Sequence, residues 1–235
     1  MKKLISLILI LCMACMLIPA MADTDVTGTW YASMMGIPMT MTLNADGTGT
    51  MISPVQGGEA PAAWTMEGDK ITITVNDSPA TGTVTADAIT LEESGMEIVF
   101  TRDAVEAITV GEIKAAESVD AFLGKWAVKY METDGLIMDI NALGSVMPDV
   151  TIADGAITFV GSSEDDMFAA MYNLLGLVYT FEDGKLAITS SVDGANATGS
   201  FELLDDGMIR MTLDSEGNTL VFYYAPADTA EQPAA

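Results

Sequence analysis

The sequence contains no histidine, and its two cysteines, Cys12 and Cys15, both lie close to the N-terminus. Histidine and cysteine supply many of the general bases, nucleophiles and transition-metal ligands of proteins. The chain also lacks a Gly-x-Ser-x-Gly motif and a phosphate-binding glycine loop. A carboxylate pair remains available because acids are abundant, although none occupies an inward position in the strand patterns described below. These absences predict a protein that is not an enzyme and that uses no cofactor.

Basic residues are also scarce. Nine lysines and arginines stand against 34 aspartates and glutamates, which gives a formal net charge of −25 at pH 7. A surface of this sign repels nucleic acid and anionic lipid, so neither is an expected partner. Acidic excess also promotes solubility, and we favour this simpler explanation of the charge.

Long hydrophobic runs are absent except at the N-terminus, where residues 4–18 are apolar and follow two lysines. The tripeptide Ala-Met-Ala at 20–22 supplies the small residues that signal peptidase requires at positions −3 and −1. We therefore interpret residues 1–22 as a signal peptide and expect the mature chain to start at Asp23. The run is shorter than the ~20 residues needed to cross a bilayer, so no membrane span is expected after cleavage.

Cleavage at this point would remove both cysteines, leaving no disulfide and no cysteine-based metal site. A lipoprotein anchor on Cys15 is not expected, because Cys12 and Met13 replace the aliphatic and small residues that such a site prefers. The expected location is extracytoplasmic, either secreted or in the cell envelope. Loss of the two lysines would bring the formal charge of the mature chain to −27.

The first predicted domain, residues 23–103, consists of short alternating runs separated by polar turns. Ile37, Met39, Met41 and Leu43 alternate with polar residues and Pro38, as expected for a half-buried strand. No gap is long enough for a crossover helix, so neighbouring strands must be antiparallel. The eight predicted strands are 28–34, 37–43, 48–52, 62–66, 70–75, 80–85, 88–92 and 96–102.

A second version of the same unit begins at Gly124 and Trp126 and occupies residues 124–225. Its predicted strands are 125–131, 149–153, 156–161, 177–182, 185–192, 197–204, 208–214 and 219–225. Residues 104–123 are predicted to be a linker with short helical character, capped at Ser118, and the alanine- and proline-rich residues 226–235 a disordered tail.

Eight meandering strands with one apolar face fold either into a sandwich or into a closed barrel, and closure removes both exposed edges. We therefore predict an all-β protein of two tandem eight-stranded antiparallel up-and-down β-barrels, the second with short helical insertions.

The Gly-x-Trp of the first strand, the eight-stranded meander and a basic residue after the last strand resemble the lipocalin and calycin barrels. The resemblance is closest to small lipocalin-like domains of secreted bacterial proteins. It implies that the tryptophan packs across the closed end of the barrel, with the last-strand arginine stacked on it. Aligning the two repeats by their Val-Phe pairs puts Tyr224 in the position of that arginine. The residues that fit the pattern are Gly28, Trp30 and Arg102 in the first repeat and Gly124 and Trp126 in the second.

The Gly-Thr-Trp-Tyr opening is also similar to the first hairpin of the avidin family. In that family the next residue is an asparagine that contacts biotin, whereas this chain has Ala32. Three tryptophans are too few to wall a biotin site in either domain, so biotin is excluded as a ligand.

The second repeat differs from the first by two long insertions, residues 132–148 and 162–176. In an antiparallel meander the connections after strands one and three leave from the same end, so both insertions should border one mouth of the second barrel. Residues 162–176 are predicted to be a helix capped by Ser162 or Ser163. Residues 135–143 are predicted to form another short helix.

These insertions are either a lid over an apolar pocket or a plug that completes the core, because an apolar helix face needs burial in both cases. The leading hypothesis is a small hydrophobic ligand or lipid bound in the second barrel. The alternative is a structural or protein-interaction module of the cell envelope with filled barrels. Buried tyrosines often only satisfy backbone partners. The candidate ligand-binding residues are Tyr130, Ile137, Met138, Phe168, Met171, Tyr172, Tyr179 and Ser190.

Clustered methionines and acidic turns do not predict a metal site here. The mature chain would keep 14 methionines, and clustered thioethers are able to bind Cu(I). Met39 and Met41, however, share a strand face with Leu43, where packing is their ordinary role. The acidic turns lack the dense oxygen spacing of a calcium loop, so hairpin formation explains them better.

Overall fold

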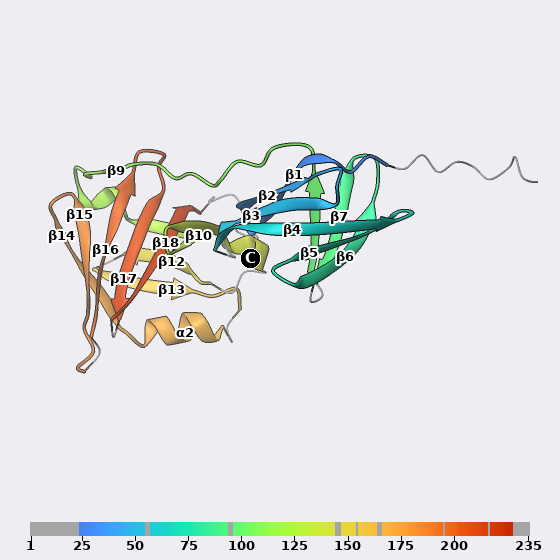
Figure 1. The fold of residues 1–235 in the computed structure, drawn as a ribbon. Coiled ribbons are helices and arrows are strands. Elements are labelled where there is room, and N and C mark those ends of the chain that lie inside the picture. The colour runs from blue at the N-terminus through green and yellow to red at the C-terminus, as the bar shows by residue number, and fades with distance from the viewer. Residues whose placement is uncertain are drawn as a thin grey trace, which may run out of the picture. The chain divides into compact units, whose positions relative to one another are not determined.

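The computed structural model describes residues 24–54, 57–93, 96–143, 147–153, 155–163, 166–194, 196–215 and 217–227. They form two compact units, each built around an antiparallel barrel, with only short helical segments (Figure 1). The expected fold class, all-β with two eight-stranded barrels in tandem, is confirmed. No helix among the described residues is long and apolar enough to cross a bilayer. The predicted signal peptide and most of the predicted tail lie outside these ranges.

The first barrel is a ring of eight strands in chain order, closed by pairing between the first and last strands at Tyr31 and Thr101. A polar turn at Asn44–Gly47 returns the chain between two of these strands, as the sequence predicts. The strands are β1 (Gly28–Met34), β2 (Ile37–Leu43), β3 (Thr48–Ser53), β4 (Gly58–Glu67), β5 (Lys70–Val75), β6 (Ser78–Val84), β7 (Ala88–Glu93) and β8 (Met96–Thr101).

Inward side chains fill the first barrel. Along β2, buried and half-buried residues alternate without a break, as the two-residue period of its sequence predicts. Burial of each large side chain contributes roughly 1.5–3 kcal/mol. The nearly inaccessible members of this core include Trp30, Met41, Leu43, Ile71, Ile73, Ile89 and Phe100.

The second barrel closes in the same way, through pairing of its first strand with its last. Two further strands extend the sheet: one pairs with the end of the first barrel strand, and one from the linker pairs with β16. The strands are β9 (Ile113–Lys114), β10 (Gly124–Thr133), β11 (Leu136–Asp139), β12 (Asp149–Ala153), β13 (Ala156–Val160), β14 (Leu177–Glu182), β15 (Lys185–Ser190), β16 (Ala197–Leu204), β17 (Ile209–Ser215) and β18 (Asn218–Pro226).

Two details recur at equivalent positions of the two rings. In each first strand the tryptophan Nε1 donates to the carbonyl four residues earlier, Trp30 to Val26 and Trp126 to Phe122, both at 2.8 Å. In each sixth strand a glycine lies against the seventh strand, and a Cβ on Gly82 or Gly199 would stand about 2 Å from a threonine carbonyl oxygen. The two rings therefore share side-chain detail as well as strand order.

Trp30 is covered by the guanidinium of Arg102, which lies 3.5 Å from the ring centroid and donates to the carbonyls of Thr27 and Thr29. The second ring has a different arrangement. Strand register places Pro226, not Tyr224, opposite Trp126. The alignment of Tyr224 with Arg102 is therefore wrong by two residues, because the Val-Phe pairs of the two last strands are not structurally equivalent.

The linker is partly regular. β9 adds to β16, and the three-residue 3-10 helix η2 (Val119–Ala121) follows. Ser118 occupies the N-cap position, but its side chain makes no capping hydrogen bond to the backbone. The carboxylates of Asp205 and Asp206 accept hydrogen bonds from the backbone N–H groups of residues 112 and 111, which fixes the linker along the second barrel.

The short helix predicted over 135–143 is wrong for its first half. Leu136–Asp139 form β11, which makes a tight hairpin with the end of β10, and the 3-10 helix η3 (Ile140–Leu143) follows. Asp134 and Gly135 both have positive φ, 52° and 77°, so the chain reverses within two residues and pairs as a strand.

Candidate functional site

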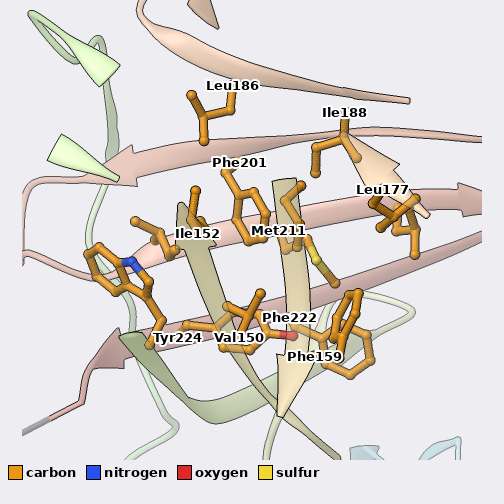
Figure 2. Packing of buried hydrophobic residues seen from close by; sticks show 14 of the residues in the cluster. Val150, Ile152, Phe159, Leu177, Leu186, Ile188, Phe201, Met211, Phe222 and Tyr224 are labelled. Carbon is orange, nitrogen blue, oxygen red and sulfur yellow. The ribbon is translucent and has the colours of Figure 1, made fainter. Parts of the chain in front are cut away.

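Apolar side chains occupy the interior of the second barrel. Figure 2 shows side chains from opposite strands pointing toward one another across the ring, with Phe201 and Met211 near the centre. Phe201, Met211, Leu213 and Ile209 have no measurable exposure. Tyr224 also lies inside, and burial raises the pKa of its hydroxyl strongly, with smaller contributions from Tyr172 and Asp149.

The insertion after β13 carries the helix α2 (Met167–Asn173), which covers a gap in the ring. β14 pairs with β13 at Ala156 and Val178, so the register leaves Phe159 beyond the first residue of β14. The side-chain amide of Asn173 takes that place. Its Oδ1 accepts from Phe159 N and its Nδ2 donates to Phe159 O, both at 2.8 Å. One side chain therefore completes the hydrogen bonding of β13 where strand pairing stops.

Tyr172 anchors the same helix to the core. Its ring lies 4.9 Å from that of Phe159, and only 8% of the residue is exposed. Burial raises the pKa of its hydroxyl. Ala169 is buried beside it. The inner face of α2 thus acts as a plug in the wall of the barrel.

The N-terminus of α2 begins later than the sequence predicts, and its cap is an aspartate. Asp166 Oδ1 accepts from the N–H groups of Phe168 and Ala169, while Oδ2 accepts from Ser162 N. These backbone donors, that of Ala169 most, hold the pKa of Asp166 below its usual value. The predicted cap at Ser162 or Ser163 is therefore wrong, because the carboxylate outcompetes a hydroxyl for the free N–H groups.

The orientation of α2 also differs from expectation. Met167, Met171, Leu174 and Leu175 follow helical spacing, which predicts a buried face. Leu175 packs on the core as predicted. Met167, Met171 and Leu174 lie on the outside instead, exposed by 77%, 49% and 77%, and Phe168 beside them is exposed by 38%. The buried face is the narrower one formed by Ala169 and Tyr172. Of the candidate ligand residues, Phe168 and Met171 therefore face solvent.

Two predicted polar contacts to a ligand are used by the backbone. Tyr179 Oη accepts from Gly155 N at 3.2 Å, in the turn between β12 and β13, at the end of the ring opposite the insertions. Ser190 Oγ donates to Leu175 O at 2.7 Å, which ties the end of the α2 segment to β15. Both hydroxyls thus hold the barrel together.

Tyr130 points outward, contrary to the strand pattern. The register of β10 against β18 shifts between Val128 and Tyr130, and this bulge moves the inward position to Met131, which packs on the core. Ile137 and Met138, the remaining candidates, are half-buried on β11 beside the same part of β10.

The outward side of this bulge carries a polar network that sequence reasoning missed. Tyr223, opposite Tyr130, donates to Glu132 Oε2 at 2.5 Å, and on the neighbouring strand Arg210 forms an ion pair with Glu202 at 3.2 Å. Tyr223 is only 4% exposed. Burial, followed by the hydrogen bond to Glu132, raises the pKa of Tyr223 to about 12. No strand pattern signals such a network, because Tyr223 occupies an outward position.

The first barrel offers open surface features. A cleft of about 450 Å³ at the Trp30 end is lined by Trp64, Met66 and the segment Thr24–Thr27. Trp64 Nε1 in this cleft donates to Asn44 O, and Asp25 accepts from the N–H and hydroxyl of Thr27. A groove of about 390 Å³ on the outer face of the sheet is lined mainly by threonines.

Within the described residues, no cluster of three or more carboxylate side chains is arranged to hold a metal ion. No protein-family model, curated protein or solved structure matches the chain. The arrangement of this chain's own residues is therefore the basis of the functional argument.

Proposed function

We propose that the protein is a non-enzymatic binding module of the cell envelope, in which two filled barrels form a rigid scaffold and the outer surface contacts another protein. The observation that carries the proposal is the use of α2: its inner face completes the wall of a packed barrel, while its larger apolar face is presented to solvent. Exposed apolar groups of this kind mark interaction sites in folded proteins.

The competing proposal is a small hydrophobic ligand or lipid held in the second barrel, with α2 as a lid. Such a ligand needs an enclosed volume of roughly 300 Å³ or more. The packed side chains of the described core, and the use of the Tyr179 and Ser190 hydroxyls by the backbone, favour the scaffold.

Native mass spectrometry of the protein purified from its own host distinguishes the two proposals. For a scaffold we expect the mass of the polypeptide alone under gentle ionisation. A lipid-sized adduct that is lost in the variant Tyr172→Ala would overturn the scaffold proposal. The same spectrum tests export, because removal of residues 1–22 would leave Asp23 as the N-terminal residue.

A further inference from the structure

Four large apolar side chains on the outer side of α2 and at its C-terminal end are exposed, and we call them the α2 stripe: Met167, Phe168, Met171 and Leu174. Val192, 45% exposed, lies beyond the helix end, where its Cγ2 would stand 2.9 Å from a Cβ on Gly176. In this helix of seven residues, Met167 is thus mostly exposed and Met171 is exposed over about half of its surface.

The contacts that orient α2 use other side chains. They are the two hydrogen bonds of Asn173, the ring contact of Tyr172 and the cap at Asp166, and none of them uses a side chain of the stripe. These anchors also prevent the helix from turning the stripe inward. Polar residues at the four positions would satisfy the same helix, so the apolar side chains call for a contact outside the barrel.

The charge around the stripe identifies the kind of partner. From residue 130 to residue 184 the sequence contains ten acidic residues and no lysine or arginine. The helix lies in the middle of this run, and its first residue follows Asp166 directly. A partner that covers the stripe therefore meets a helix whose neighbouring sequence carries acidic but no basic residues, which favours basic flanking residues.

The same charge argues against other occupants. Two copies of this chain each carry a formal charge of −25, so their mutual repulsion opposes pairing through α2. Anionic lipid is repelled for the same reason. Two of the four side chains are methionines, which are unbranched and adapt to the shape of an apolar partner.

We propose that the α2 stripe binds a basic amphipathic segment of a partner protein, with apolar side chains packed on Met167, Met171 and Leu174 and lysine or arginine on both sides. This inference rests on the proposed function as a protein-interaction module. It adds the binding surface and the chemical class of the partner.

The test uses the full mature chain and a labelled 15-residue helical peptide with leucine at helical spacing and lysine elsewhere. Fluorescence anisotropy should show saturable binding that weakens as salt is raised, because charge steers the contact. A peptide of the same composition with the leucines dispersed should bind with an affinity at least about tenfold lower. The uncharged double variant Met171→Gln/Leu174→Gln should lose affinity by a similar factor.

The control is Val99→Gln, which removes an apolar side chain of exposure (44%) similar to that of Met171 (49%) from β8 of the first barrel and should leave binding unchanged. Unchanged methyl signals of the core residue Met211 would show that the double variant is folded. Equal binding of both peptides, or of both variants, would overturn the inference, since it would leave only non-specific charge attraction.

Other occupants have their own readouts. Dimerisation at pH 7 in sedimentation velocity that the double variant abolishes would replace the partner segment with a second copy. Binding to phosphatidylcholine vesicles at pH 7 would replace it with a neutral lipid surface. Either result would overturn the inference. Peptide failure with a lipid-free native mass rejects the inference alone, whereas a lipid adduct lost in Tyr172→Ala rejects the proposed function.

Discussion

Single side chains complete both barrels where backbone pairing stops. Arg102 covers Trp30 and binds two carbonyls after the last strand of the first ring, and Asn173 supplies the hydrogen bonds that β14 does not reach in the second. Polar residues of this kind thus satisfy backbone hydrogen bonds at strand ends, and an alternation pattern does not predict these contacts. This explains why candidates chosen for a ligand, such as Tyr179 and Ser190, turned out to bind the backbone.

Replacement of Asn173 should weaken the second barrel specifically. Asn173→Ala leaves Phe159 N–H and C=O without their partners, and we expect a loss of about 1–3 kcal/mol in the free energy of unfolding. Asn173→Asp is the matched control, since a carboxylate still accepts from Phe159 N but no longer donates to its carbonyl. Chemical denaturation measures both, and equal stability of wild type and Asn173→Ala would contradict the bridging role.

The hydroxyl of Tyr223 should ionise at a higher pH than an ordinary tyrosine. Its pKa is raised to about 12, by burial first and then by Glu132. The neutral hydroxyl therefore favours the folded state; this contribution is complete below pH 10, the usual tyrosine pKa, and is lost as pH rises through 12. The ultraviolet difference spectrum between wild type and Tyr223→Phe isolates its ionisation. A midpoint near pH 10 would exclude the network, and Glu132→Gln should lower the midpoint.

Secondary-structure elements show most clearly what the sequence can predict. Two-residue alternation and polar turns predict all sixteen barrel strands, most with ends within one or two residues of those in the structure. The pattern is informative because alternate side chains of a half-buried strand face the core and the solvent. The orientation of α2 could not be predicted, since helical spacing reveals an apolar face without saying what covers it. The sequence also gives no signal of the bulge at Val128–Tyr130, which turns Tyr130 to the outer side of the barrel.

The stability of the α2 cap should depend on pH, because protonation of Asp166 weakens it. Because backbone donors lower the pKa of Asp166 in the folded state, the cap stabilises α2 above the unfolded value of about 4 and is lost as pH falls through the lowered value. The protection factors of the Phe168 and Ala169 amides against hydrogen exchange should fall in that range, and should already be low at neutral pH in Asp166→Ala. Asp166→Asn keeps an acceptor that does not ionise. In this variant the protection of the Phe168 and Ala169 amides should not change across the same pH range.

For the molecule as a whole, the main electrostatic feature is an excess of acidic residues over basic residues. The formal charge of −25 opposes association of copies at neutral pH, although the α2 stripe is exposed. The tandem arrangement was predictable because each repeat carries its own Gly-x-Trp and its own set of eight strands. The function was harder to predict, because neither composition nor strand pattern shows how closely the inward side chains pack.

Acidification should therefore expose a latent tendency to associate. Near pH 4 the carboxylates lose much of their charge, and copies should begin to associate through the α2 stripe. Light scattering between pH 7 and pH 4 should show growth in particle size that Met171→Lys reduces and Val99→Lys on β8 does not. Equal association of the two variants would assign the effect to another surface.

The paired glycines of the sixth strands constrain how this module diverges. A methyl group at Gly82 or Gly199 would stand about 2 Å from a carbonyl oxygen of the next strand, so neither position accepts a side chain unless the backbone moves, whereas the second ring carries long insertions at one rim. Distant descendants of the module would then share little overall identity. They should be recognisable by one tryptophan near the start and one glycine facing the penultimate strand.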